Sequence, residues 1–141
     1  MSQPPQTLDS TLRFLREVHG ILLFAMFMQV LTVEKILPHP AQTLNATIGT
    51  SFLVLSVLIV GATVLIRVKL VGTALDTLRS TPNDAIAWGN WRKGVVLTDV
   101  LLDSVVLYGF ALRFLGGTLQ QSLPFYAAGI GLMILWWPKR P

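Results

Sequence analysis

Residues 95–115, VVLTDVLLDSVVLYGFALRFL, decide the fold of this chain. As a helix, these 21 residues would extend about 30 Å and could cross the hydrocarbon core of a bilayer. Two carboxylates, Asp99 and Asp103, interrupt the apolar run. An acidic residue deep in a membrane helix costs about 2.5–3.5 kcal/mol on insertion scales, so it usually faces a bundle interior, a partner or a water path. We therefore expect the rest of the chain to shelter both carboxylates.

The composition indicates a membrane protein and excludes several other classes. Of the 141 residues, 52% are hydrophobic and 13% are charged, whereas soluble domains average about 25% charged residues. The absence of cysteine excludes disulfides, thiol catalysis and cysteine-ligated metal centres. The net charge of +4 comes from basic residues that flank apolar segments, so we do not expect nucleic acid as a partner.

The hydropathy pattern predicts an all-α polytopic membrane protein, a single domain over 1–141 that forms a four-transmembrane-helix bundle. The expected spans are 12–36, 48–70, 95–115 and 123–137. Gln29, Glu34 and Lys35 argue against reading the first span as a cleaved signal peptide.

Prolines and glycines predict where these helices end. Residues 37–46 contain two prolines and are expected to form a loop, and the second helix is expected to continue past the bilayer core until Pro82. Residues 83–94 are expected to form a polar connection at headgroup level. Gly116 and Gly117 should end the third helix, residues 118–122 should form a turn, and Pro124 should lie in the first turn of the last span.

The basic residues predict the orientation. Four spans bring both termini to one side, which carries nine basic residues, while the opposite side carries two. The nine are Arg13, Arg16, Arg67, Lys69, Arg79, Arg92, Lys93, Lys139 and Arg140, and the two are Lys35 and Arg113. By the positive-inside rule, both termini are expected to be cytoplasmic, with the protein integral to an inner or plasma membrane.

The two acids are the candidate ion-binding residues. Asp99 and Asp103 are four residues apart and share one helical face, and Asp103 lies about 12 Å into its span, near mid-bilayer. A carboxyl group that gains and loses a proton or cation at that depth would suit ion translocation.

A structural reading of the same acids remains open. Arg67 or Lys69, at the same end of the preceding helix, could pair with Asp99. Asp103 could then bond to Ser104, to Gln29 or to another copy of the chain, since polar contacts between membrane helices are common.

Other polar residues do not converge on a cofactor. His19 and His39 fall toward opposite sides of the membrane, so they cannot bind one haem together, and His19 is expected to be a polar residue at the interface. We expect no cofactor and no bound metal. Gly129 and Gly131, in the sequence AAGIG, are expected to form a helix-packing surface.

The run from Asp103 to Phe110, DSVVLYGF, resembles the second helix of the rotary ATP synthase c subunit, or proteolipid, in which Tyr-Gly follows an ion-binding carboxylate. Upstream, residues 72–82 resemble the first-helix end and polar loop of that family. The resemblance covers roughly residues 72–110. It would make Asp103 the ion-carrying acid, with Tyr108 beside it in the motif, and would place the loop from Arg79 to Pro82 against a rotor stalk.

Two functions follow from these observations. The first is a small non-enzymatic membrane protein, a structural or accessory component of a membrane complex or of a homo-oligomer, with both acids buried between helices in the lipid bilayer. The alternative is a proton- or cation-translocating protein, proteolipid-like or a small transporter, that uses Asp103. No motif of covalent catalysis occurs, so an enzyme is not expected.

Overall fold

A computed structural model describes residues 8–36 and 45–138, and this part of the chain contains helices and no strand. The helices are α1 (Leu8–Leu31), α2 (Ala46–Ile66), α3 (Thr73–Ser80), α4 (Ala85–Phe114) and α5 (Leu119–Leu135). A π-helical turn, Thr32–Ile36, extends α1, and a second, Arg67–Gly72, joins α2 to α3 in one continuous rod. The predicted all-α fold is confirmed.

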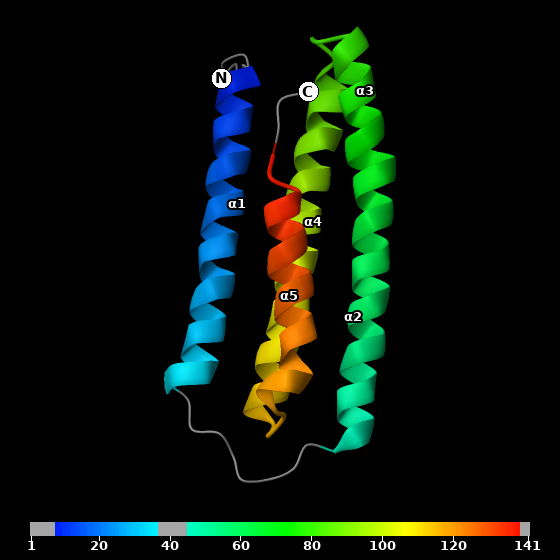
Figure 1. The fold of residues 1–141 in the computed structure, drawn as a ribbon. Helices are drawn as coiled ribbons and strands as arrows, with labels where there is room; N and C mark the ends of the chain where they lie inside the picture. The colour runs from blue at the N-terminus through cyan, green and yellow to red at the C-terminus, as the bar shows by residue number, and fades with distance from the viewer. Residues whose placement is uncertain (1–7, 37–44, 139–141) are drawn as a thin grey trace, which may run out of the picture.

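The four rods lie side by side, with α4 and α5 between α1 and the α2–α3 rod (Figure 1). Helix α4 packs against every other helix, and α5 lies along it. The start of α1, the α3–α4 connection and the end of α5 all lie at one end of the bundle (Figure 1). We call this the α3–α4 end. Since the rods alternate in direction, α1 and α4 run parallel to each other.

The outer surface of the bundle is apolar. Three of the helical rods, Asp9–Ile36, Ala46–Ser80 and Ala85–Phe114, are long and apolar enough to cross a membrane, and α5 is a shorter apolar helix of 17 residues. Large side chains such as Phe24, Leu58 and Ile134 are exposed on this surface. Because such a surface is unfavourable in water and suits acyl chains, the architecture is that expected of a helical membrane protein.

Helix α4 begins well before residue 95, so the prediction of a polar connection over 83–94 was wrong. The Asp84 side chain caps the helix by accepting hydrogen bonds from the backbone N–H groups of Ile86 and Ala87, both at 2.9 Å. Trp91 is buried among residues of α1, α3 and α4. The first turns of α4 pack on protein. Hydropathy measures suitability for lipid, so it underestimated the length of this helix.

The α4–α5 junction confirms one prediction and corrects two. Gly116 has a φ of 93°, and the Gly117 N–H donates to the Leu112 carbonyl at 2.8 Å, which ends α4 at the glycines as predicted. Residues 118–122 are not a turn, because Thr118 forms a capping box with Gln121 and starts α5 at Leu119. Pro124 consequently lies in the second turn of α5 and not in the first.

Close helix packing depends on Gly129. A Cβ atom at this position would lie 2.4 Å from Cγ2 of Val106 and 2.9 Å from the Leu102 carbonyl oxygen, so only glycine fits between α5 and α4. At Gly131 a Cβ would meet nothing within 4 Å. Of the predicted small-residue surface, Gly129 therefore packs against another helix and Gly131 does not. Most of the expected loop over 37–46, including His39, lies outside the described residues.

Candidate functional site

A row of polar side chains joins α1 to α4. It consists of three couples, which we call the polar seam: His19 with Asp99, Gln29 with Asp103, and Glu34 with Arg113. The first member of each couple comes from α1 or its π-helical extension, and the second comes from α4. Because the two rods run parallel, the couples follow one another from the α3–α4 end toward the opposite end of the bundle.

His19 and Asp99 form the most deeply buried couple. His19 Nδ1 lies 2.9 Å from Asp99 Oδ2, and His19 Nε2 lies 2.9 Å from the Met133 carbonyl oxygen of α5. Both residues of the pair are almost fully buried, at 0% and 1% exposure. His19, which was expected as a polar residue at the interface, is therefore enclosed by protein, with both ring nitrogens in hydrogen-bond contact.

The hydrogen bonds of His19 determine how many protons the pair holds. A carbonyl oxygen only accepts, so Nε2 must carry a hydrogen. The contact between Nδ1 and Asp99 then needs one more proton, which resides either on the imidazole, giving an ion pair, or on the carboxyl, giving two neutral groups. The couple is net neutral in both forms. A neutral couple explains how an acid can lie inside the bundle without the full cost of a buried charge.

Arg67 lies beside this couple without binding it directly. Its guanidinium donates to the Trp136 carbonyl at 2.8 Å and to Thr98 Oγ1 at 3.4 Å, and it stacks over the Trp136 ring at 5.4 Å. In the ion-pair form of the couple, the charge of Arg67 is attracted to Asp99 through space. Lys69 is exposed on the surface of the same π-helical turn. Neither of the two predicted ion-pair partners bonds to Asp99. Arg67 is an electrostatic neighbour of Asp99, and the Asp99 carboxylate bonds to His19 instead.

Of the two contacts within the chain that the sequence suggested for Asp103, one is present. The Gln29 amide nitrogen donates to Asp103 Oδ1 at 3.1 Å. Ser104 instead donates to the backbone carbonyl of Val100. Gln29 Oε1 is buried without a hydrogen-bond partner among the described residues. Asp99 and Asp103 therefore both face α1, as their four-residue spacing requires.

Glu34 and Arg113 form the third couple, at the opposite end of the bundle. Arg113 Nε and Nη2 donate to the two carboxylate oxygens at 2.6 and 2.8 Å, and Nη1 donates to the Gly117 carbonyl at 2.6 Å. Tyr108, the other residue singled out in the sequence, stacks on Phe52 of α2 at 5.4 Å. Asp103 and Tyr108 consequently contact different neighbouring helices.

Sequence reasoning missed His19 and Glu34 as partners, although a signal for both existed. His19 and Asp99 lie at similar depths from the α3–α4 end, and Glu34 and Arg113 lie at similar depths at the opposite end. Matching polar residues by depth between parallel spans would have suggested both couples. Among the described residues, no three His, Cys, Asp or Glu side chains converge as a metal site would require.

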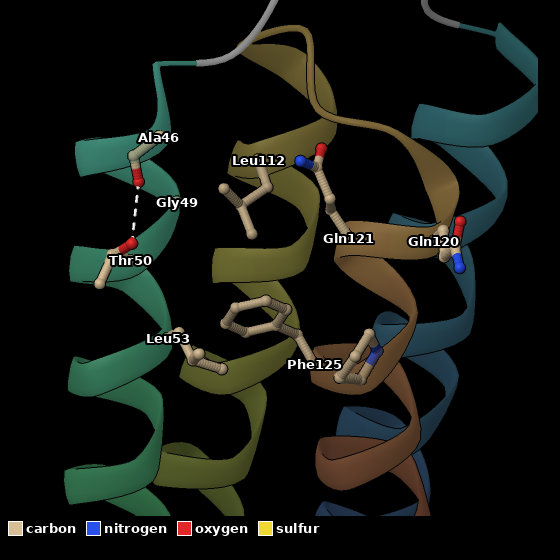
Figure 2. A pocket seen from close by; sticks show the side chains of 9 residues that line it. Ala46, Gly49, Thr50, Leu53, Leu112, Gln120, Gln121 and Phe125 are labelled. Carbon is tan, nitrogen blue, oxygen red and sulfur yellow. Dashed lines mark hydrogen bonds between the residues drawn. The ribbon is translucent and has the colours of Figure 1, made fainter.

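A separate cavity of about 380 Å³ opens between α2 and α5, over α4. Figure 2 shows Thr50, Leu53, Leu112 and Phe125 around it, with the Thr50 hydroxyl donating to the Ala46 carbonyl at 3.0 Å. No residue of the polar seam lines this cavity. The cavity is therefore not in contact with the buried acids.

Comparison of the sequence with models of known families and with curated proteins, and of the fold with solved structures, gave no significant match.

Proposed function

We propose that this chain is a small non-enzymatic integral membrane protein, a structural or accessory component of a membrane complex or homo-oligomer, in which the polar seam fastens α1 to the bundle. The carrying observation is the matching of polar groups across one helix interface. Asp99, Asp103 and Arg113 of α4 each have a hydrogen-bond partner on α1 or its extension. Such pairing suits a specific and lasting helix contact.

The charge distribution supports cytoplasmic termini. Basic residues concentrate at the α3–α4 end, where α1 starts and α5 ends. This end carries Arg13, Arg16, Arg67, Lys69, Arg79, Arg92 and Lys93, and Lys139 and Arg140 follow α5 in the sequence. The positive-inside rule assigns this end to the cytoplasm.

One variant distinguishes a structural role of the polar seam from ion transport. Asp103→Asn keeps an oxygen that accepts from Gln29 but cannot carry a negative charge. We expect liposomes with the wild type, liposomes with Asp103→Asn and liposomes of lipid alone to show the same proton and sodium flux. Asp103→Asn should also lower the stability of the protein slightly. Asp76→Asn, an exposed acid on α3, is the matched control. Flux above the lipid background that disappears only in Asp103→Asn would overturn the proposal.

Proton or cation translocation is the second candidate function. It is favoured by the single proton shared by His19 and Asp99 and by Gln29 Oε1, a buried polar atom without a hydrogen-bond partner among the described residues. Such an atom is a candidate to hold water along the seam. The resemblance of residues 72–110 to a proteolipid favours the same candidate.

Carbodiimide modification tests the second candidate. The reagent attacks a carboxyl group that is protonated in an apolar setting. If Asp103 carries sodium, sodium should protect it from modification. If Asp103 carries protons, modification should fall as the pH rises and the carboxyl loses its proton. In either case Asp103→Asn should abolish both modification and flux. Modification that is insensitive to sodium and to pH, or no modification, would count against translocation through Asp103.

A further inference from the structure

We propose that a cavity at the α3–α4 end binds the phosphate headgroup of an anionic phospholipid. The cavity measures about 300 Å³ and lies between the α2–α3 rod, α4 and the end of α5. Arg67 and Arg79 both line it, and its lining includes no acid. This site is separate from the polar seam and needs only the membrane setting of the proposed function.

Arg67 supplies a fixed donor group. Its hydrogen bonds to Trp136 and Thr98 hold the guanidinium in place and use two of its five N–H donors. A positioned guanidinium with remaining donors is the group that proteins use to bind phosphate oxygens.

Arg79 supplies an exchangeable charge. It is 67% exposed on α3 and forms a single-turn ion pair with Asp76 at 3.3 Å. Exposed pairs of this kind contribute little to stability, because both side chains stay hydrated. Arg79 can therefore turn from Asp76 to a phosphate without disturbing the fold.

The remaining walls favour a lipid over a soluble anion. Trp91, Trp136 and Trp137 line the cavity together with apolar residues such as Val71 and Leu135. Tryptophan is enriched where membrane proteins meet headgroups, and basic pockets between membrane helices at that level bind anionic lipid headgroups. The glycerol and upper acyl atoms of a phospholipid would contact the aromatic and apolar walls, which a free phosphate ion would leave uncovered.

The experiment uses the tryptophans as reporters. The protein in neutral detergent is titrated with dioctanoyl phosphatidylglycerol, and fluorescence is recorded. Dioctanoyl phosphatidylcholine and inorganic phosphate are titrated in parallel. We expect a saturable change with phosphatidylglycerol and at least a fivefold weaker response to each of the other two. Equal responses to the two lipids would overturn the proposal, and equal binding of inorganic phosphate would assign the cavity to a soluble anion instead.

Four variants test the role of Arg79. Arg79→Gln should weaken phosphatidylglycerol binding about fivefold, as expected for the loss of one cation at a lipid surface. Arg79→Lys keeps the charge and should weaken binding less. Asp76→Asn should strengthen binding, because it removes the competitor of the phosphate. Arg92→Gln is the matched control, since Arg92 lies at the same end but stacks over Phe14 outside the cavity. Equal losses in Arg79→Gln and Arg92→Gln would show general surface attraction and refute a specific site.

Discussion

Arg113 donates hydrogen bonds to both carboxylate oxygens of Glu34, from Nε at 2.6 Å and from Nη2 at 2.8 Å. The two residues lie on different rods, and their side chains are 12% and 16% exposed. This geometry gives a directional contact that lysine could not reproduce. The pair fixes the rotation of the π-helical turn after α1 relative to the end of α4.

Arg113→Gln should lower the free energy of unfolding by about 2 kcal/mol, because it leaves a largely buried carboxylate without its guanidinium. Unfolding by sodium dodecyl sulfate in mixed micelles measures the loss. The double variant Glu34→Gln with Arg113→Gln should lose less than the sum of the single variants. Strict additivity would mean that the two residues do not stabilise the fold through each other.

The His19–Asp99 couple predicts an order of stabilities. Asp99→Asn should cost about 1 kcal/mol or less, since the amide can donate to a neutral imidazole. Asp99→Leu should cost about 1–3 kcal/mol by leaving Nδ1 unpaired. His19→Ala should cost most, because it leaves a buried carboxyl unpartnered and a cavity. The same unfolding assay ranks the three. If Asp99→Asn cost as much as His19→Ala, the pair would have to be an ion pair and not two neutral groups.

Gly129→Ala should destabilise the bundle by about 1–3 kcal/mol, because the new methyl group would overlap Val106 and the Leu102 carbonyl. Gly131→Ala, two residues along the same helix, should raise stability by about 0.5–1 kcal/mol, because its Cβ would meet nothing within 4 Å and alanine has the better helix propensity. Thermal unfolding in detergent compares the two variants directly. Similar effects of both substitutions would contradict the close approach of α5 to α4.

Gly116→Ala should cost about 1–2 kcal/mol, since an L side chain is strained at a φ of 93°. Gly20→Ala in α1 is the control, because a Cβ there meets nothing within 4 Å. This control should raise stability by about 0.5–1 kcal/mol through its better helix propensity. Circular dichroism followed during heating provides both values. A neutral Gly116→Ala would show that the turn after α4 tolerates another backbone conformation.

Hydropathy predicted the fold because each helix carries an apolar surface. Composition and apolar length determine that these rods form, and Gly116 with Gly117 determines where α4 ends. The starts of α4 and α5 were mislocated because Asp84 and Thr118 cap them outside the most apolar stretches. Caps act through local hydrogen bonds, which hydropathy does not register.

The candidate site was only partly predictable. The sequence identified Asp99 and Asp103 because a carboxylate within a span demands shelter. Their partners depend on how α1 is rotated against α4, and that rotation is a tertiary property. Arg67 illustrates the limit, since its attraction to Asp99 follows from shared depth, whereas its hydrogen bonds to Trp136 and Thr98 depend on where α5 ends.

The parallel placement of α1 beside α4 has a consequence for biogenesis. Helix α1 packs on α4 and α5 and makes little contact with α2, the next helix to be synthesised. At a synthesis rate of about 5–20 residues per second, several seconds pass between the emergence of α1 and that of α4 from the ribosome. During that interval His19, Gln29 and Glu34 need shelter from the insertion machinery or from headgroups. Substitutions that disrupt α4 should consequently leave α1 without its packing surface, and cellular quality control should recognise the exposed polar residues of α1.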